Sequence, residues 1–200
     1  MVETASTMLP LGTRAPEFSL PEPATGKIVS LADFNDKPML LVAFICNHCP
    51  YVIRIKEGLT AFANEQARRG LAMVAINSND VEVYTDDRPE LMVSDVKKYA
   101  YPFPYLFDAE QSIAKAYHAA CTPDFFLFDA ERKLVYRGQF DEARPGNDKA
   151  ADGHSMREAI DALLLGQKIP AEQKASIGCN IKWRPGQAPK YFSGRSVISI

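Results

Sequence analysis

The two cysteines Cys46 and Cys49 lie where a buried strand is expected to end and a helix to begin. The apolar run 39–45 precedes them, and residues 52–63 repeat apolar side chains at helical spacing before a stop at Gly70. This layout places the first sulfur at the end of the strand and the second one turn along. Unpaired amides and the dipole at a helix start favour an anion. We therefore expect the Cys46 thiol to ionise below the pKa of ~8.5 of an ordinary cysteine.

A pair of cysteines with this spacing could be a redox centre, part of a metal site, or two packed core residues. A zinc site built on Cys-x-x-Cys usually takes a second such pair or two histidines, whereas His118 and His154 are isolated here. Free cysteines also pack as small apolar residues. The strand-to-helix context favours a dithiol redox centre over both alternatives. No metal and no other cofactor is expected.

Composition narrows the class of protein. A length of 200 residues suits one domain, 1–200, and the net charge of −2 comes with no basic stripe, so nucleic acid is an unexpected partner. The longest apolar run is too short to span a membrane, and the N-terminus lacks the pattern of a signal peptide. Four cysteines are too few for a disulfide scaffold. We expect a cytoplasmic protein, and its oligomeric state is not fixed by the sequence.

The rest of the chain alternates between strand and helix patterns. The expected elements are an N-terminal hairpin over 18–31, strands at 39–45, 71–76 and 105–108, helices from 52, 89, 112 and 156, and a hairpin over 125–138. Strand–helix–strand units imply a parallel half of the sheet, and the second hairpin adds antiparallel strands. The predicted class is α/β, a mixed sheet sandwiched by helices with an N-terminal hairpin and an inserted strand–helix. A core of about 12–165 is followed by a tail, 171–200.

Three motifs together resemble one known superfamily. They are the opening Gly-Thr-Arg-Ala-Pro-Glu-Phe-Ser-Leu at 12–20, the Cys-x-x-Cys-Pro at 46–50, and Thr122-Pro123 ahead of a hairpin. Over about 12–165 the chain resembles the thioredoxin superfamily, in its AhpC/TSA branch of peroxiredoxins and TlpA/ResA-type oxidoreductases. The resemblance implies a thioredoxin-like fold and a thiol–disulfide oxidoreductase that reduces or exchanges disulfides through its Cys-x-x-Cys centre.

The resemblance also assigns roles to individual residues. Cys46 would be the attacking thiolate and Cys49 the resolving thiol. Pro123 matches the family's cis-proline, and cis bonds are rare outside X-Pro. Thr122 and Cys121, directly before it, would then adjoin the substrate. The implied partners are protein or low-molecular-weight disulfides, with a thioredoxin-like or small thiol electron donor.

Three further residues have more than one interpretation. A charged His48 would stabilise the Cys46 thiolate, or His48 is a solvated turn residue. We expect Cys121 close to the active centre, as a third redox thiol, a metal ligand or a buried small residue. Cys179 lies in the tail and cannot be positioned, and a Cys121–Cys179 relay stays open.

The chain departs from thioredoxin at the position of the buried acid. Leu40 stands six residues before the first cysteine, where thioredoxin has an acid for proton transfer. A different proton acceptor is implied. Glu57, Asp124 and Asp141 are candidates by chain position alone.

Two alternative activities can be weighed on motif. The peroxiredoxin pattern Pro-x-x-x-Thr-x-x-Cys places its cysteine at Cys49, but Cys46 stands at the Thr position and Val42 at the Pro position. Thiol peroxidase activity is therefore the weaker prediction. A metal-binding module similar to the Sco-type copper proteins is weaker still, because those proteins space their cysteines as Cys-x-x-x-Cys.

Overall fold

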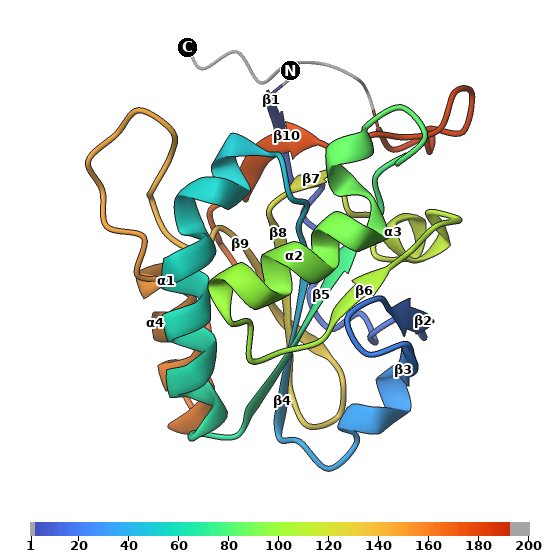
Figure 1. Cartoon of the computed structure of the whole chain (residues 1–200). Coiled ribbons are helices and arrows are strands. Elements are labelled where there is room, and N and C mark those ends of the chain that lie inside the picture. The colour runs from blue at the N-terminus through green and yellow to red at the C-terminus, as the bar shows by residue number, and fades with distance from the viewer. Residues whose placement is uncertain (1–2, 193–200) are drawn as a thin grey trace.

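A five-stranded mixed sheet forms the centre of the protein. The computed structural model describes residues 3–192 and orders the strands β6–β5–β4–β8–β9 (Figure 1). The three parallel strands are β4 (Met39–Phe44), β5 (Leu71–Asn77) and β6 (Tyr105–Phe107). β8 (Asp124–Phe128) runs antiparallel to β4 and pairs with β9 (Leu134–Gly138). The predicted parallel half and antiparallel hairpin are both present.

The central strand β4 is apolar throughout because both of its faces are covered. Leu40, Val42 and Phe44 point into one buried cluster, and Leu41 and Ala43 point into the other. Successive side chains of a strand alternate between faces, so a strand covered on both sides reads as a continuous apolar run. The strand fixes the position of the cysteines that follow it.

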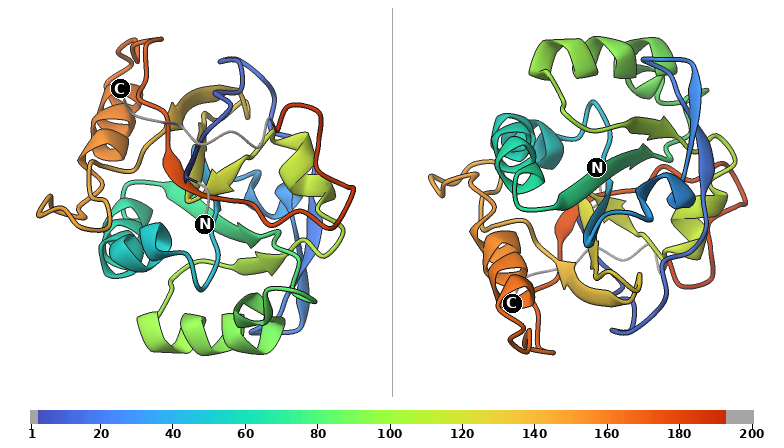
Figure 2. Two further views of the ribbon diagram at one scale, coloured as in Figure 1. Left: turned by 90° about the horizontal axis from the view of Figure 1, so that it is seen from above. Right: turned by 90° about the horizontal axis from the view of Figure 1, so that it is seen from below.

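Helices and the N-terminal segment cover the two faces. α1 (Pro50–Ala67), α2 (Pro89–Tyr99) and α4 (His154–Leu164) contribute to one core cluster. The other face is covered by α3 (Ser112–Ala116), the hairpin β2 (Ser19–Glu22)–β3 (Lys27–Ser30) and the short helix η1 (Leu31–Phe34). Both panels of Figure 2 show α1 and α4 on one side of the sheet, with α3 and the N-terminal segment on the other. The predicted helices and first hairpin are thus found, and they sandwich the sheet.

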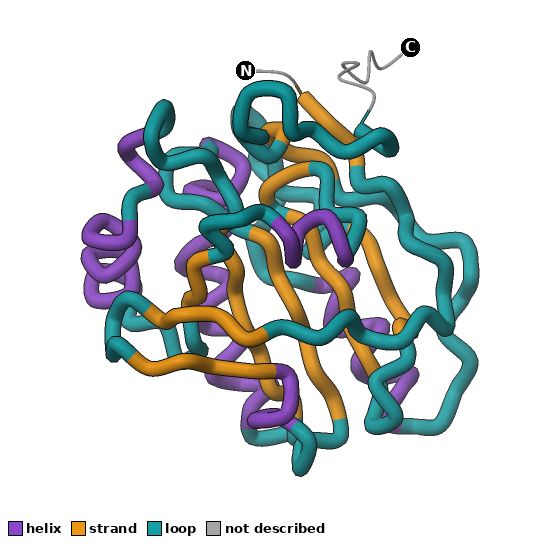
Figure 3. Tube along the Cα trace, turned by 90° about the vertical axis from the view of Figure 1, so that its right-hand side faces the viewer, coloured by secondary structure: helices purple, strands orange, loops and turns teal. Residues whose placement is uncertain are grey.

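A second, three-stranded sheet was not predicted. β10 (Ile177–Asn180) lies between β1 (Glu3–Ala5) and β7 (Cys121–Thr122), antiparallel to both. Figure 1 shows β1 and β10 together beside the start of α1. Residues 165–176 lead from α4 into β10 without helix or strand, and Figure 3 draws such loop segments in teal. The segment expected to be a tail therefore packs against the end of the molecule that holds the cysteines.

The helices show no membrane-spanning candidate. Within residues 3–192, no helix combines the length and apolar character needed to cross a bilayer.

Candidate functional site

The Cys46–Cys49 segment connects the end of β4 to the start of α1. Cys49 is the N-cap residue of α1, and Pro50 occupies the first helical position, where a missing N–H costs no hydrogen bond. Both cysteines are free thiols, and their side chains are hydrogen-bonded to each other. Cys46 is 1% exposed and Cys49 is 0% exposed. Both sulfurs of the pair are therefore buried.

Thr122 contacts both sulfurs. Its hydroxyl oxygen lies 3.4 Å from Cys46 Sγ, and its carbonyl oxygen accepts a hydrogen bond from Cys49 Sγ at 3.1 Å. The following peptide bond, Thr122–Pro123, is cis. The structure thus brings four sequence-predicted site residues, Cys46, Cys49, Thr122 and Pro123, into one cluster.

Cys179 is the third thiol of this cluster. β10 pairs with β7 so that Cys179 lies opposite Thr122. Its side chain is hydrogen-bonded to that of Cys49, and the residue is 2% exposed. Sequence reasoning could not position Cys179, because the strand pairing that brings it here joins segments far apart in the chain.

Cys121 lies next to the thiol cluster, directly before Thr122, but its side chain faces away from the two sulfurs. Neighbouring residues of a strand point to opposite sides, so Cys121 faces away when Thr122 faces the sulfurs. The described contacts of its Sγ are with the carbonyl oxygens of Pro123, at 3.5 Å, and Ser176, at 3.9 Å. Burial raises the pKa of this thiol well above its usual value. Of the interpretations left open by the sequence, this environment fits a buried small residue close to the active centre best.

His48 is paired with a buried acid. Its Nδ1 lies 2.7 Å from Asp87 Oδ2, and its ring stacks on Tyr84 with the centroids 5.9 Å apart. The hydrogen bond with Asp87 raises the pKa of the imidazole, although burial works against that shift. The side chain of His48 is 20% exposed and that of Asp87 is fully buried. His48 is therefore paired and largely buried, unlike the solvated turn residue of one sequence interpretation.

Asp87 is the functional candidate that sequence reasoning missed. It ends the short helix η2 (Thr85–Asp87). Its carboxylate accepts hydrogen bonds from the Asn47 amide at 2.8 Å and the Asn79 side chain at 2.7 Å. Its oxygen, a His48 ring nitrogen and Cys46 Sγ all lie within 4.8 Å of one another. A buried acid does therefore adjoin the first cysteine, but it comes from η2.

The three positions suggested earlier for the proton acceptor fit less well. Glu57 is exposed on α1. Asp141 accepts hydrogen bonds from the amides of Ala143 and Gly153, and burial raises its pKa. Burial also raises the pKa of Asp124 to about 7, and its carboxylate accepts a hydrogen bond from the Ala120 amide. No contact between Cys46 and any of these three acids is described within residues 3–192, and Asp87 replaces them as the candidate.

The order of the thiol pKa values differs from the predicted order. Burial raises the pKa of Cys46 well above its usual value, and the thiol's hydrogen bond to Cys49 and the charge of Asp87 act in the same direction. The hydrogen bonds from Cys179 and Cys46 lower the pKa of Cys49, with help from the Val52 amide of the helix start. The Thr122 carbonyl opposes this, since it accepts the S–H of protonated Cys49. The surrounding donors therefore lower the pKa of Cys49, while the pKa of Cys46 is raised. The helix start favours its own N-cap residue and not Cys46.

The same residues include one potential set of metal ligands. Cys46, His48 and Asp87 could each offer one donor atom, a mixed sulfur, nitrogen and oxygen set of the kind that transition metals accept. His48 and Asp87 already satisfy each other through their 2.7 Å contact. Metal binding at this point would therefore compete with the His48–Asp87 pair.

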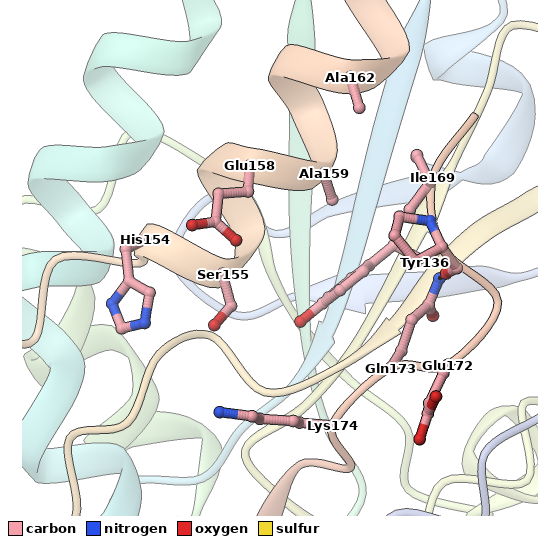
Figure 4. A pocket seen from close by; sticks show the side chains of 11 residues that line it. Tyr136, His154, Ser155, Glu158, Ala159, Ala162, Ile169, Glu172, Gln173 and Lys174 are labelled. Atoms are coloured by element: carbon pink, nitrogen blue, oxygen red, sulfur yellow. Dashed lines mark hydrogen bonds between the residues drawn. The ribbon is translucent and has the colours of Figure 1, made fainter. Parts of the chain in front are cut away.

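A cavity of about 340 Å³ lies apart from the cysteines, between α4 and the segment after it. Figure 4 shows the Tyr136 side chain reaching toward Ser155 and Glu158 of α4, with Lys174 on another wall. None of its lining residues belongs to the thiol cluster. The cavity is therefore separate from the candidate redox site.

Comparisons with known proteins point to one family. The Redoxin family model matches residues 10–153. A solved structure of a hypothetical protein from Sinorhizobium meliloti 1021 is 56% identical, with a TM-score of 0.89 over 92% of this chain and 100% of that one. An uncharacterized conserved protein from Geobacillus kaustophilus is 48% identical, with a TM-score of 0.90 over 93% of this chain and 98% of that one.

A more distant structure supports the fold. A putative thiol:disulfide interchange protein DsbE from Chlorobium tepidum is 21% identical, with a TM-score of 0.61 over 78% of this chain and 99% of that one. The comparison with curated proteins finds no significant match. The thioredoxin-like fold predicted from the sequence is confirmed.

Proposed function

The chain belongs to the redoxin family of the thioredoxin superfamily, and on that premise we propose that it is a thiol–disulfide oxidoreductase with Cys46 and Cys49 as its redox pair. One observation carries the proposal: the two thiols are hydrogen-bonded to each other at the start of α1, and both contact Thr122. A general redox role follows from the family. The dithiol chemistry is supported by this geometry.

Cys49 is proposed as the attacking thiolate. The thiolate is the nucleophile in disulfide exchange, and Cys49 is the sulfur whose pKa its neighbours lower. Attack on a substrate disulfide forms a mixed disulfide with Cys49 and releases one substrate thiolate. The sequence-based assignment, in which Cys46 attacks first, is reversed here because burial and Asp87 hold the pKa of Cys46 high.

Cys46 then resolves the mixed disulfide. Its sulfur contacts that of Cys49, and its proton can pass to the adjacent His48–Asp87 pair. Attack of Cys46 on the Cys49 sulfur forms the Cys46–Cys49 disulfide and releases the second substrate thiolate. Two electrons have then moved from the dithiol to the substrate, and a thiol donor restores the reduced pair. Protein or small-molecule disulfides and thiols are the partners this chemistry requires.

Thr122 and the cis-proline Pro123 that follows it are proposed to form part of the wall around the sulfurs of the redox pair. The Thr122 hydroxyl lies 3.4 Å from Cys46 Sγ and can donate to it when that sulfur ionises. This contact lowers the pKa of Cys46, against the larger effect of burial. Thr122 would therefore stabilise Cys46 as a leaving group when the disulfide is reduced again.

A disulfide-reductase assay with peptide mapping tests the proposal. Wild type oxidised by a substrate disulfide should contain a Cys46–Cys49 bond, and Cys49→Ser should lose turnover. Cys121→Ser is the matched control, since that sulfur faces Pro123 and Ser176. Full turnover by Cys49→Ser, or oxidised wild type without the Cys46–Cys49 bond, would show the mechanism to be wrong.

Thiol peroxidase activity is the second candidate. The lowered pKa of Cys49 favours it, because a thiolate at the position of the peroxiredoxin cysteine is the group that peroxide would oxidise. Rapid peroxide consumption with a sulfenate trapped on Cys49 would support this activity over disulfide exchange.

A further inference from the structure

The backbone on both sides of the cis-proline is paired with a later part of the same chain. In the β7–β10 ladder, Cys179 lies opposite Thr122. Beyond the ladder, the Ser176 hydroxyl donates to the Pro123 carbonyl at 2.7 Å, and the Ile181 amide donates to the Ala120 carbonyl at 3.0 Å. Residues 176–181 therefore run as one extended segment along 120–123.

A glycine lets this segment lie directly on the backbone of the site. A Cβ atom at Gly178 would lie 2.0 Å from the Thr122 carbonyl oxygen and 3.1 Å from Pro123 Cδ. Any larger residue at 178 would therefore push β10 off the site. On the outer side, Thr4 of β1 pairs with Gly178 and holds the strand down. The close approach of β10 to Thr122 therefore depends on Gly178, a residue of β10.

The segment brings a thiol to the redox pair. Cys46, Cys49 and Cys179 belong to one buried cluster, and the Cys49 side chain is hydrogen-bonded to both of the others. An extended peptide can bind a protein by adding a strand to an exposed edge. Here β10 occupies the β7 edge beside the redox pair, and Cys179 is where the cysteine of such a peptide would meet Cys49.

We propose that Cys179 is a third redox thiol, which exchanges with the Cys46–Cys49 disulfide from its position on β10. This inference rests on the proposed function of the Cys46–Cys49 pair. The Cys179 sulfur attacks the Cys49 sulfur, the Cys49–Cys179 bond forms, and the Cys46–Cys49 bond breaks. Cys46 leaves with the electron pair and takes up the proton that Cys179 gives up. The exchange moves one disulfide within the protein and needs no external oxidant.

The exchange gives the three thiols distinct duties. Cys49 is the common partner in both disulfides, because its side chain is hydrogen-bonded to Cys46 and to Cys179. Cys46 is returned to the reduced state beside the His48–Asp87 pair. The oxidising equivalent moves to β10, a strand joined to the protein through β1 and β7.

Disulfide mapping after limited oxidation tests the proposal. The probe is one equivalent of diamide, which accepts two electrons and two protons, followed by blocking of free thiols and digestion with trypsin. Cys46 and Cys49 stay on one tryptic peptide, 28–54, while Cys179 is on another, 175–182. The Cys46–Cys49 bond therefore closes a loop within one peptide, and the Cys49–Cys179 bond joins two.

Wild type should give both the loop within peptide 28–54 and the joined peptides 28–54 and 175–182. Cys46→Ser should give the joined peptides in most molecules. Cys179→Ser should give only the loop, which tests the proposed function by itself. A folded Cys46→Ser protein without joined peptides, beside a Cys179→Ser protein that forms the loop, overturns the role of Cys179 and leaves the proposed function intact. A Cys179→Ser protein without the loop counts against the proposed function.

Two further variants keep the test specific. Cys121→Ser should behave as wild type, because Cys121 is on the same ladder but opposite Asn180. Gly178→Ala keeps every thiol but moves β10 away from Thr122. Loss of the joined peptides with retention of the loop is expected, and joined peptides at the wild-type level would contradict the proposed placement. Circular dichroism and thermal melting of each variant report whether it is folded.

Discussion

The imidazole of His48 and the buried carboxylate of Asp87 form one hydrogen-bonded unit, with Nδ1 and Oδ2 2.7 Å apart. Both groups lie within 4.8 Å of Cys46 Sγ. The pKa of Cys46 therefore responds to the net charge of His48 and Asp87 together. The carboxylate alone raises the pKa of Cys46, and a protonated imidazole beside it offsets that charge.

His48→Ala should raise the pKa of Cys46 and lower the reduction potential of the Cys46–Cys49 disulfide. Without the imidazole, the charge of Asp87 on Cys46 is unopposed, and a less stable thiolate makes the disulfide a weaker oxidant. The pH dependence of Cys46 alkylation, with the other three cysteines replaced by serine, measures the first effect. His154→Ala, which removes a surface histidine 3.1 Å from Asp152, is the control. An unchanged Cys46 titration in His48→Ala would refute this electrostatic role.

Asp87→Asn should lower the pKa values of both His48 and Cys46. The hydrogen bond from the carboxylate is the main cause of the raised His48 pKa, and the same charge raises the pKa of Cys46. Asparagine keeps an oxygen to accept from the Asn47 amide, so the segment between the cysteines should stay in place. NMR titration of the His48 ring protons gives the first value directly. A His48 pKa equal to that of wild type would show that the pair is not formed in solution.

Asp124→Asn should remove part of the pH dependence of stability. Burial raises the pKa of Asp124 to about 7 in the folded protein, compared with ~3.9 in an unfolded chain. Between these values the folded state holds more protons, so the free energy of unfolding falls as the pH rises, by up to ~1.4 kcal/mol per unit. Urea unfolding from pH 4 to pH 8 should show a flatter profile for the variant. Identical profiles would mean that Asp124 titrates normally.

Gly58→Ala should destabilise the protein although it lies inside α1. Alanine normally stabilises a helix interior by about 1 kcal/mol relative to glycine. Here the new Cβ would lie 1.7 Å from the Ala151 carbonyl oxygen, so the loop after β9 has to move, at an expected net cost of ~1–3 kcal/mol. Chemical denaturation measures the change. The exposed neighbour Glu57→Ala should stay within about 0.5 kcal/mol of wild type, and a stabilised Gly58→Ala would contradict the close contact.

Local patterns were enough to predict the main sheet and most helices. The run over 39–45 became β4 because that strand is buried throughout, and the helical spacing after Cys49 became α1 because one face of that helix is buried. β10 escaped because Ile-Gly-Cys-Asn has neither alternation nor length. Its strand pairing depends on β1 and β7, which are themselves two or three residues long. Such short strands are specified by long-range contacts, which a local pattern does not contain.

The candidate site was predictable to the extent that it is local. Cys46, His48 and Cys49 lie together because they are nearly consecutive, and Thr122 joins them through the thioredoxin-like fold. Asp87 was not predictable, because its carboxylate turns back from η2 to the cysteine segment. The prediction of which thiol has the lower pKa was also wrong. That order depends on which cysteine is the N-cap residue and on how many donors surround its sulfur. These are properties of the packed thiol cluster.

The position of β10 also sets the order in which the thiol cluster can be assembled during protein synthesis. Chains emerge from the ribosome N-terminus first, so Cys46 and Cys49 are translated well before Cys179. Until 176–181 emerge and dock along 120–123, nothing from β10 covers the pair. The nascent protein therefore passes through a stage in which β10 does not yet cover its dithiol, and docking of 176–181 ends that stage.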